Sequence, residues 1–183
     1  CTDYQDTIPH LFYYNAFLML SNGMEAKVGT LGSKYEFFHE WKRLAEEDQG
    51  NVALETMLRG ICKKENFLDL FENFILYDHS NGHTAKILAR NHQYLGVNEA
   101  MKAYAARKLN DGKLGVFWHT QGSGKSYSMV LFAQKVRRKF AGSPTFVILT
   151  DREELNTQIS DTFENCGLLG KTKATQFIAT SGD

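Results

Sequence analysis

One eight-residue segment at positions 119–126, His-Thr-Gln-Gly-Ser-Gly-Lys-Ser, constrains the fold of this chain more than any other feature. It follows a short apolar run at 114–118 and precedes a helical pattern at 124–140. A loop that wraps a phosphate must turn sharply and bring several backbone N–H groups to one point, which glycine permits because it lacks Cβ. The N-terminus of the next helix then faces the anion with its positive dipole end. The order of strand, glycine-rich loop and helix therefore predicts a phosphate-binding site.

Each residue type in this loop has its own expected role. Gly122 and Gly124 permit the turn, Lys125 reaches the outer phosphates, and the Ser126 hydroxyl is a ligand for Mg²⁺. The strict motif has glycine where this chain has His119, so only its second half is matched, a departure that the helicase and translocase variant of the loop tolerates. We therefore expect ATP or ADP to bind with Mg²⁺. The loop residues expected to bind are Thr120, Gln121, Gly122, Ser123, Gly124, Lys125 and Ser126.

The hydrophobic pattern predicts an α/β chain. Apolar runs at 114–118 and 145–150 are typical of strands that are buried on both faces, and they alternate with helical patterns. This alternation predicts a parallel sheet covered by helices. The helical patterns cover 93–109, 124–140 and 152–163.

A different pattern precedes this part of the chain. We expect a β-hairpin at 11–31, with Asn22-Gly23 in a tight turn, and three short helices between 36 and 77. The polar segment 78–83 has turn-forming residues and is the best internal boundary, and a short strand near 86–89 follows it.

Composition narrows the class of protein. The chain has 183 residues, of which 43% are hydrophobic and 23% charged, as in folded globular proteins. It lacks both a signal-peptide pattern and an apolar run near the roughly 18 residues that a membrane helix needs, so we expect a cytoplasmic protein with no membrane partner. The net charge is zero, but residues 84–139 hold 11 Lys and Arg against 2 Asp and Glu. Such a basic block suits phosphate, although solvated helix faces would explain part of it.

Several segments outside the loop carry a family resemblance. They are Ile-Pro-His-Leu-Phe at 8–12, Ser-Asn-Gly at 21–23, Glu-Ala-Lys-Val-Gly at 25–29, Arg-Asn-His-Gln-Tyr at 90–94 and Val-Ile-Leu-Thr-Asp-Arg at 147–152. With the loop, they make nearly the whole chain resemble the motor and nuclease subunit of type I restriction-modification enzymes, a superfamily 2 translocase. The resemblance implies that residues 1–83 are the end of a nuclease domain and a helical connector. Residues 84–183 would then be the N-terminal part of the first RecA-like motor lobe, so we expect the chain to be a fragment.

The resemblance also implies roles for single residues. Gln93 matches the glutamine that recognises adenine, since a side-chain amide both donates to and accepts from the base edge. Lys125 would stabilise the charge that develops on the phosphates. Arg152 matches a segment that touches the DNA backbone, but Asp151 beside it would also suit a purely structural role as a helix N-cap.

In the resembled family, ATP hydrolysis drives translocation of double-stranded DNA past a complex with modification and specificity subunits and ends in cleavage, so the parent would be a type I site-specific deoxyribonuclease. This sequence contains neither the Asp-Glu-x-His motif that orients water for hydrolysis nor the acidic nuclease motif. We therefore expect the chain alone to bind nucleotide without hydrolysing it. Two alternatives stay open: a small phosphate-loop kinase, and a nucleotide-binding interaction module without enzymatic activity.

Overall fold

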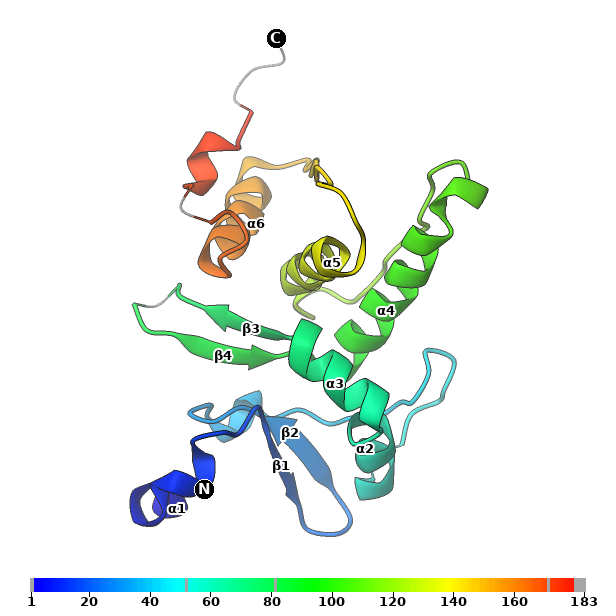
Figure 1. Ribbon diagram of the computed structural model, residues 1–183. Helices are drawn as coiled ribbons and strands as arrows, with labels where there is room; N and C mark the ends of the chain where they lie inside the picture. Colours follow the sequence, from blue (N-terminus) through cyan, green and yellow to red (C-terminus); the bar gives the residue numbers. More distant parts are fainter. Residues whose placement is uncertain (1, 52, 81, 171, 180–183) are drawn as a thin grey trace. The chain divides into compact units, whose positions relative to one another are not determined.

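The structure is a computed structural model that describes residues 2–51, 53–80, 82–170 and 172–179 (Figure 1). The chain forms two compact units. The first unit comprises Cys1–Ile75 and Ala85–His92, and the second comprises Leu76–Thr84 and Gln93–Asp183. Two elements, β3 (Ile75–Asp78) and α4 (Asn91–Ala105), therefore have residues in both units.

The first unit begins with α1 (Thr2–Thr7), the 3-10 helix η1 (Pro9–Phe12) and an antiparallel hairpin. The hairpin pairs β1 (Leu18–Ser21) with β2 (Ala26–Gly29), in a register that sets Ser21 opposite Ala26. Asn22 holds the turn, because its Oδ1 accepts hydrogen bonds from the backbone N–H groups of Met24 (3.0 Å) and Glu25 (2.7 Å). The predicted hairpin is confirmed, with shorter strands than expected and a four-residue turn.

Two of the three short helices predicted between 36 and 77 form. They are α2 (Leu54–Ile61) and α3 (Lys64–Asn73), while only the 3-10 helix η2 (Tyr35–Phe37) forms near the first. Trp41 comes from the irregular segment that follows, yet it is 2% exposed. Its indole packs on α2 at Gly60, where an added Cβ would lie 2.2 Å from Nε1. Burial of Trp41 against α2 and of Phe38 against Gly29 therefore takes place without the predicted helix.

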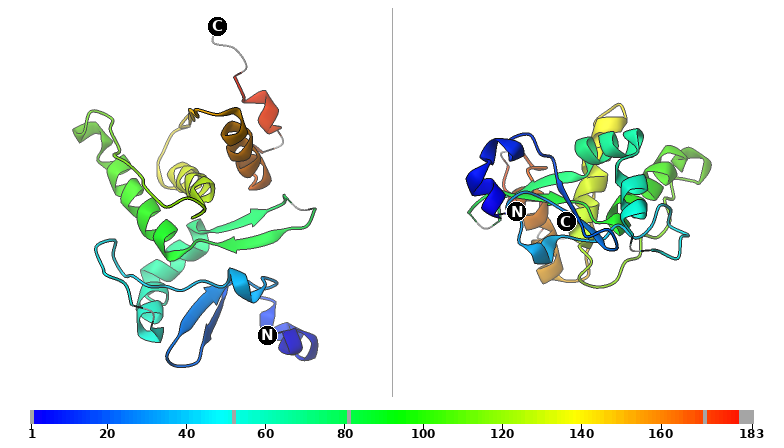
Figure 2. Two further views of the ribbon diagram at one scale, coloured as in Figure 1. Left: turned by 180° about the vertical axis from the view of Figure 1, so that it is seen from behind. Right: turned by 90° about the horizontal axis from the view of Figure 1, so that it is seen from below.

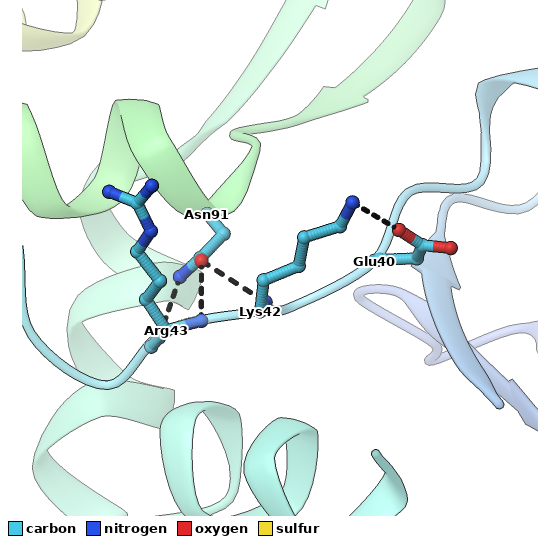
Figure 3. Close-up of polar contacts among 4 residues, drawn as sticks. All are labelled: Glu40, Lys42, Arg43 and Asn91. Atoms are coloured by element: carbon cyan, nitrogen blue, oxygen red, sulfur yellow. Dashed lines mark hydrogen bonds and ion pairs between the residues drawn. The ribbon is translucent and has the colours of Figure 1, made fainter. Parts of the chain in front are cut away.

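A buried asparagine satisfies part of this irregular backbone (Figure 3). Asn91 opens α4 and is 7% exposed. Its Oδ1 accepts from the N–H groups of Lys42 (3.2 Å) and Arg43 (2.9 Å), and its Nδ2 donates to the carbonyl of Arg43 (2.9 Å). Lys42 in turn pairs with Glu40 at 2.8 Å. These bonds replace the strand or helix partners that the segment lacks.

The second unit is mainly helical. Beyond α4 it contains η3 (Arg107–Leu109), α5 (Lys125–Lys139), α6 (Glu153–Asn165) and η4 (Ala174–Gln176). Helix α5 buries Val130, Leu131 and Val136, and it contacts α6 (Figures 1 and 2). The predicted helices at 93–109, 124–140 and 152–163 are confirmed within a few residues. The predicted strand near 86–89 is β4 (Ala85–Leu88), which forms a two-stranded sheet with β3.

The expected parallel sheet is not confirmed in the described residues. Segments 114–118 and 145–150 have no strand pairing, and the second is an extended link between α5 and α6 (Figure 2). Val116 is 94% exposed and Leu149 is 92% exposed. The described residues contain two two-stranded sheets only, so the mixed α/β class is confirmed and a RecA-like sheet is not. An apolar strand becomes part of a sheet only when neighbouring strands supply its backbone partners, and its own composition does not provide them.

None of the helices in the described part of the chain combines the length and apolarity needed to span a lipid bilayer.

Candidate functional site: a glycine-rich loop at the start of helix α5

Two glycines give the loop its shape. Gly122 has φ +76° and Gly124 has φ +84°, both in the left-handed region that side-chain-bearing residues rarely adopt. Gly124 is also the N-cap residue of α5. The structure therefore places the glycine-rich turn directly before the helix, in the order that phosphate binding requires.

The ammonium group of Lys125 lies against the loop. Lys125 is the first residue of α5, and its Nζ donates hydrogen bonds to the carbonyls of His119 (2.8 Å) and Thr120 (3.3 Å). The side chain of Lys125 is exposed, and that of Ser126, in the same helical turn, is half-buried. A cation held by neutral carbonyls at a helix N-terminus is well placed for an anion, because a phosphate oxygen is the stronger acceptor.

Gln93 reaches the loop from α4. It is 4% exposed, and its Nε2 donates to the carbonyl of Gly124 at 2.9 Å. The same carbonyl accepts the backbone N–H of Ser128 at 3.1 Å, the first bond of the helix. An added Cβ on Gly124 would lie 2.8 Å from Nε2 of Gln93, so this position needs glycine for space as well as for its backbone angle. The structure thus joins Gln93 to the glycine-rich loop, although 31 positions separate Gln93 from Gly124.

The departure from the strict motif at His119 has a packing explanation. The imidazole of His119 packs edge-on against the ring of Phe117, with centroids 4.4 Å apart. Both rings approach α4 at Gly96, where an added Cβ would lie 2.6 Å from Phe117 and 3.4 Å from His119. The imidazole therefore packs beside α4, while the backbone carbonyl of His119 accepts the hydrogen bond from Lys125.

The other predicted residues lie in different surroundings. Thr120 and Gln121 are exposed, and the N–H of the half-buried Ser123 donates to the carbonyl of Thr120 at 3.3 Å. Arg152 lies apart from the loop in sequence, at the N-cap position of α6. Its side chain is 77% exposed, and its Nε lies 3.8 Å from Asp151. Such an exposed pair contributes at most about 1 kcal/mol.

The suggestion that Asp151 caps α6 is wrong. Arg152 occupies the N-cap position, and no side-chain hydrogen bond caps this helix.

Sequence reasoning missed two residues that contact the start of α5. The hydroxyl of Tyr127 donates a hydrogen bond to Oδ2 of Asp78, a residue 49 positions earlier. The sequence could have indicated Tyr127, because it lies two positions after Lys125 in the first turn of the same helix. No sequence feature marked Asp78 beyond its place in the polar segment 78–83, because its approach to α5 depends on tertiary structure.

Comparison with known proteins relates this site to a family. A family model described as SWI2/SNF2 ATPase matches residues 92–181, which include the loop, α5 and α6. The HindI endonuclease subunit of a type I restriction enzyme from Haemophilus influenzae is 37% identical over 171 residues, a match that covers 88% of this chain and 16% of that protein. The chain is homologous to the endonuclease subunits of type I restriction enzymes.

Further type I relatives agree. The putative MjaIXP endonuclease subunit of Methanocaldococcus jannaschii is 31% identical over 183 residues, covering 86% of this chain and 17% of that protein. The putative MjaVIIP subunit of the same organism is 28% identical over 171 residues, covering 88% of this chain and 16% of that protein. The chain thus spans about a sixth of the length of these type I endonuclease subunits. The resemblance inferred from the sequence motifs is confirmed.

Proposed function

We propose that this chain is the nucleotide-binding part of a type I restriction endonuclease subunit and binds ATP or ADP, with Mg²⁺, at the loop 119–126. The observation that carries the proposal is the geometry of that loop. Gly122 and Gly124 are both left-handed, and the ammonium of Lys125 lies on two loop carbonyls. Gln93 contacts the same loop through Gly124.

The residues present suit a bound nucleotide. The first backbone N–H groups of α5 and the ammonium of Lys125 would hold the phosphates, and Lys125 would neutralise charge on them. The Ser126 hydroxyl would ligate Mg²⁺, which commonly takes one or two protein ligands and completes its shell with phosphate and water. The described residues contain no cluster of His, Cys, Asp or Glu that would hold a metal without phosphate. The side-chain amide of Gln93 would form hydrogen bonds with the adenine edge, while its Nε2 remains beside the carbonyl of Gly124.

The activity of the complete protein follows as part of the same proposal. ATP hydrolysis would drive translocation along double-stranded DNA, in a cytoplasmic complex with modification and specificity subunits, and would end in DNA cleavage. Residues 1–83 would be the end of the nuclease domain and its connector, and residues 84–183 the first part of a RecA-like motor lobe. Arg152, exposed at the start of α6, would contact the DNA backbone. The type I relatives and the ATPase family match support these assignments.

Two exposed apolar segments are consistent with the proposal that this chain is the first part of a motor lobe. Val116 and Trp118 are 94% and 76% exposed, and Val147 and Leu149 are 80% and 92% exposed. Strands from elsewhere in the complete protein would pair with segments 114–118 and 145–150, bury these side chains and form the parallel sheet that the sequence pattern predicts.

Titration of the chain with a fluorescent ADP analogue in the presence of Mg²⁺ tests the nucleotide site. Lys125→Ala should raise the Kd about tenfold or more, because it removes a charge-assisted contact to phosphate. Lys108→Ala is the matched control, since Lys108 is an exposed lysine on η3, and it should leave the Kd unchanged. Equal binding by wild type and Lys125→Ala, or no binding by folded wild-type chain, would contradict the proposal.

A further inference from the structure

Tyr127 joins the phosphate loop to a buried carboxylate. It lies in the first turn of α5, two residues after Lys125, and its side chain is half-buried. Its ring lies beside the loop, because an added Cβ on Gly124 would be 3.8 Å from Cδ2 of Tyr127. Its hydroxyl donates a hydrogen bond to Oδ2 of Asp78. The ring of Tyr127 therefore lies beside Gly124, and its hydroxyl is bonded to the last residue of β3.

Asp78 is held at the end of β3 as a buried acceptor. It is 7% exposed, and its Oδ1 accepts the backbone N–H of Ser80 at 2.8 Å. Burial acts to raise the pKa of Asp78, but the hydrogen bonds from Tyr127 and Ser80 outweigh it and leave that pKa below its ordinary value. Asp78 is therefore a carboxylate at neutral pH.

Burial and the charge of Asp78 raise the pKa of two groups beside this carboxylate, Tyr127 and Cys166. Burial, and then the hydrogen bond and charge of Asp78, raise the pKa of Tyr127, so the phenol keeps its proton and remains a donor. Burial, and then the charge of Asp78, raise the pKa of the Cys166 thiol to about 12. The bond between Tyr127 and Asp78 thus joins a neutral donor to an ionised acceptor, the kind of hydrogen bond that is stronger than a neutral pair.

We propose that Asp78 and Tyr127 are positioning residues for the phosphate loop, which fix the first turn of α5 so that Lys125 and Ser126 face the phosphates and Mg²⁺. The inference rests on the nucleotide site proposed above. Helix α5 begins at a left-handed glycine without a side-chain cap, and Gln93 and Tyr127 supply hydrogen bonds from other parts of the chain at its start. Gln93 contacts the N-cap carbonyl, and Tyr127 anchors the helix three residues further on.

The test is the Kd of Mg-ADP in the full-length natural protein. Tyr127→Phe removes only the hydroxyl and should raise the Kd about five- to twentyfold. Asp78→Ala should have a similar effect, and Asp78→Asn a smaller one, because asparagine keeps an acceptor oxygen for Tyr127. Tyr77→Phe is the matched control, since Tyr77 lies next to Asp78 on β3 and is 52% exposed, and its Kd should not change.

A double variant separates positioning from general destabilisation. If the two residues act through one bond, Tyr127→Phe should add nothing to the Kd of Asp78→Ala. A purely structural role would lower the melting temperature of Tyr127→Phe but leave its Kd unchanged well below that temperature.

The outcomes for the two proposals are distinct. If Lys125→Ala weakens binding while Tyr127→Phe stays within twofold of wild type, or if the effects of Tyr127→Phe and Asp78→Ala are additive, the positioning role is overturned and the nucleotide site stands. If Lys125→Ala has no effect on the Kd, the proposed function itself fails.

Discussion

Replacement of Gly124 by alanine should damage the loop more than the same change at Gly122. Both residues are left-handed, with φ +84° and +76°, so each alanine incurs the backbone cost of that region, about 1–2 kcal/mol. Their surroundings differ. A Cβ at Gly122 meets no atom within 4 Å, whereas a Cβ at Gly124 lies 2.8 Å from Nε2 of Gln93.

The additional cost at Gly124 comes from the hydrogen bond that the new methyl group displaces. Gln93 is 4% exposed and donates to the Gly124 carbonyl. A buried amide that loses its partner costs about 1–3 kcal/mol. Gly122→Ala should therefore reduce the free energy of unfolding by about 1–2 kcal/mol, and Gly124→Ala by about 2–5 kcal/mol.

Urea unfolding followed by far-UV circular dichroism measures this difference, and hydrogen exchange of the first-turn amides of α5 localises it. In a Gln93→Ala background, Gly124→Ala should cost only what Gly122→Ala costs, since the displaced amide is gone. Equal losses for the two glycine variants in the wild-type background, within about 0.5 kcal/mol, would refute the steric reasoning.

Three other changes give separate predictions. Burial and then the charge of Arg90 lower the pKa of His39 from 6.5 to about 4, so between these pH values the unfolded chain binds a proton that the native chain does not. The free energy of unfolding should therefore fall by about 2 kcal/mol from pH 8 to pH 5. A His39→Gln variant whose urea midpoint declines equally over this range would contradict the prediction. Glycine to alanine inside a helix usually gains about 1 kcal/mol. Gly60→Ala should instead lose about 1–3 kcal/mol, because its Cβ would lie 2.2 Å from Nε1 of Trp41, and tryptophan fluorescence during urea unfolding checks the sign. The 183-residue chain should bind ATP yet release no phosphate above background, because its sequence lacks the Asp-Glu-x-His motif; steady phosphate release that Lys125→Ala abolishes would disprove this.

Sequence patterns predicted the secondary-structure elements that depend on interactions between residues close in sequence. The hairpin at Asn22 forms because asparagine bonds to N–H groups two and three positions away. The helices α4, α5 and α6 lie close to their expected positions because apolar periodicity and helix propensity act within a few turns. The loop glycines adopt the angles that their residue type favours. The Trp41 segment misled the pattern, because a run of spaced apolar residues can be buried without being helical.

The candidate site likewise has one part that the sequence predicted and another that only the structure revealed. Residues 119–126 were identified as the candidate site from sequence because the motif is contiguous and its glycines, lysine and serine each have an expected role. The contact of Gln93 with Gly124, the packing of His119 on Phe117 and the bond between Tyr127 and Asp78 join parts of the chain that no local rule relates.

By itself, the sequence determined where this chain turns, where it is helical and where its glycine-rich loop lies, because those properties depend on backbone freedom and side-chain chemistry over a few residues. Only the tertiary structure shows that, within the described residues, segments 114–118 and 145–150 have no strand partner, since a strand needs a partner for its backbone and its own residues cannot supply one. Tertiary structure also decided which buried groups hold the start of α5, because hydrogen bonds between distant residues exist only once the chain has brought them together.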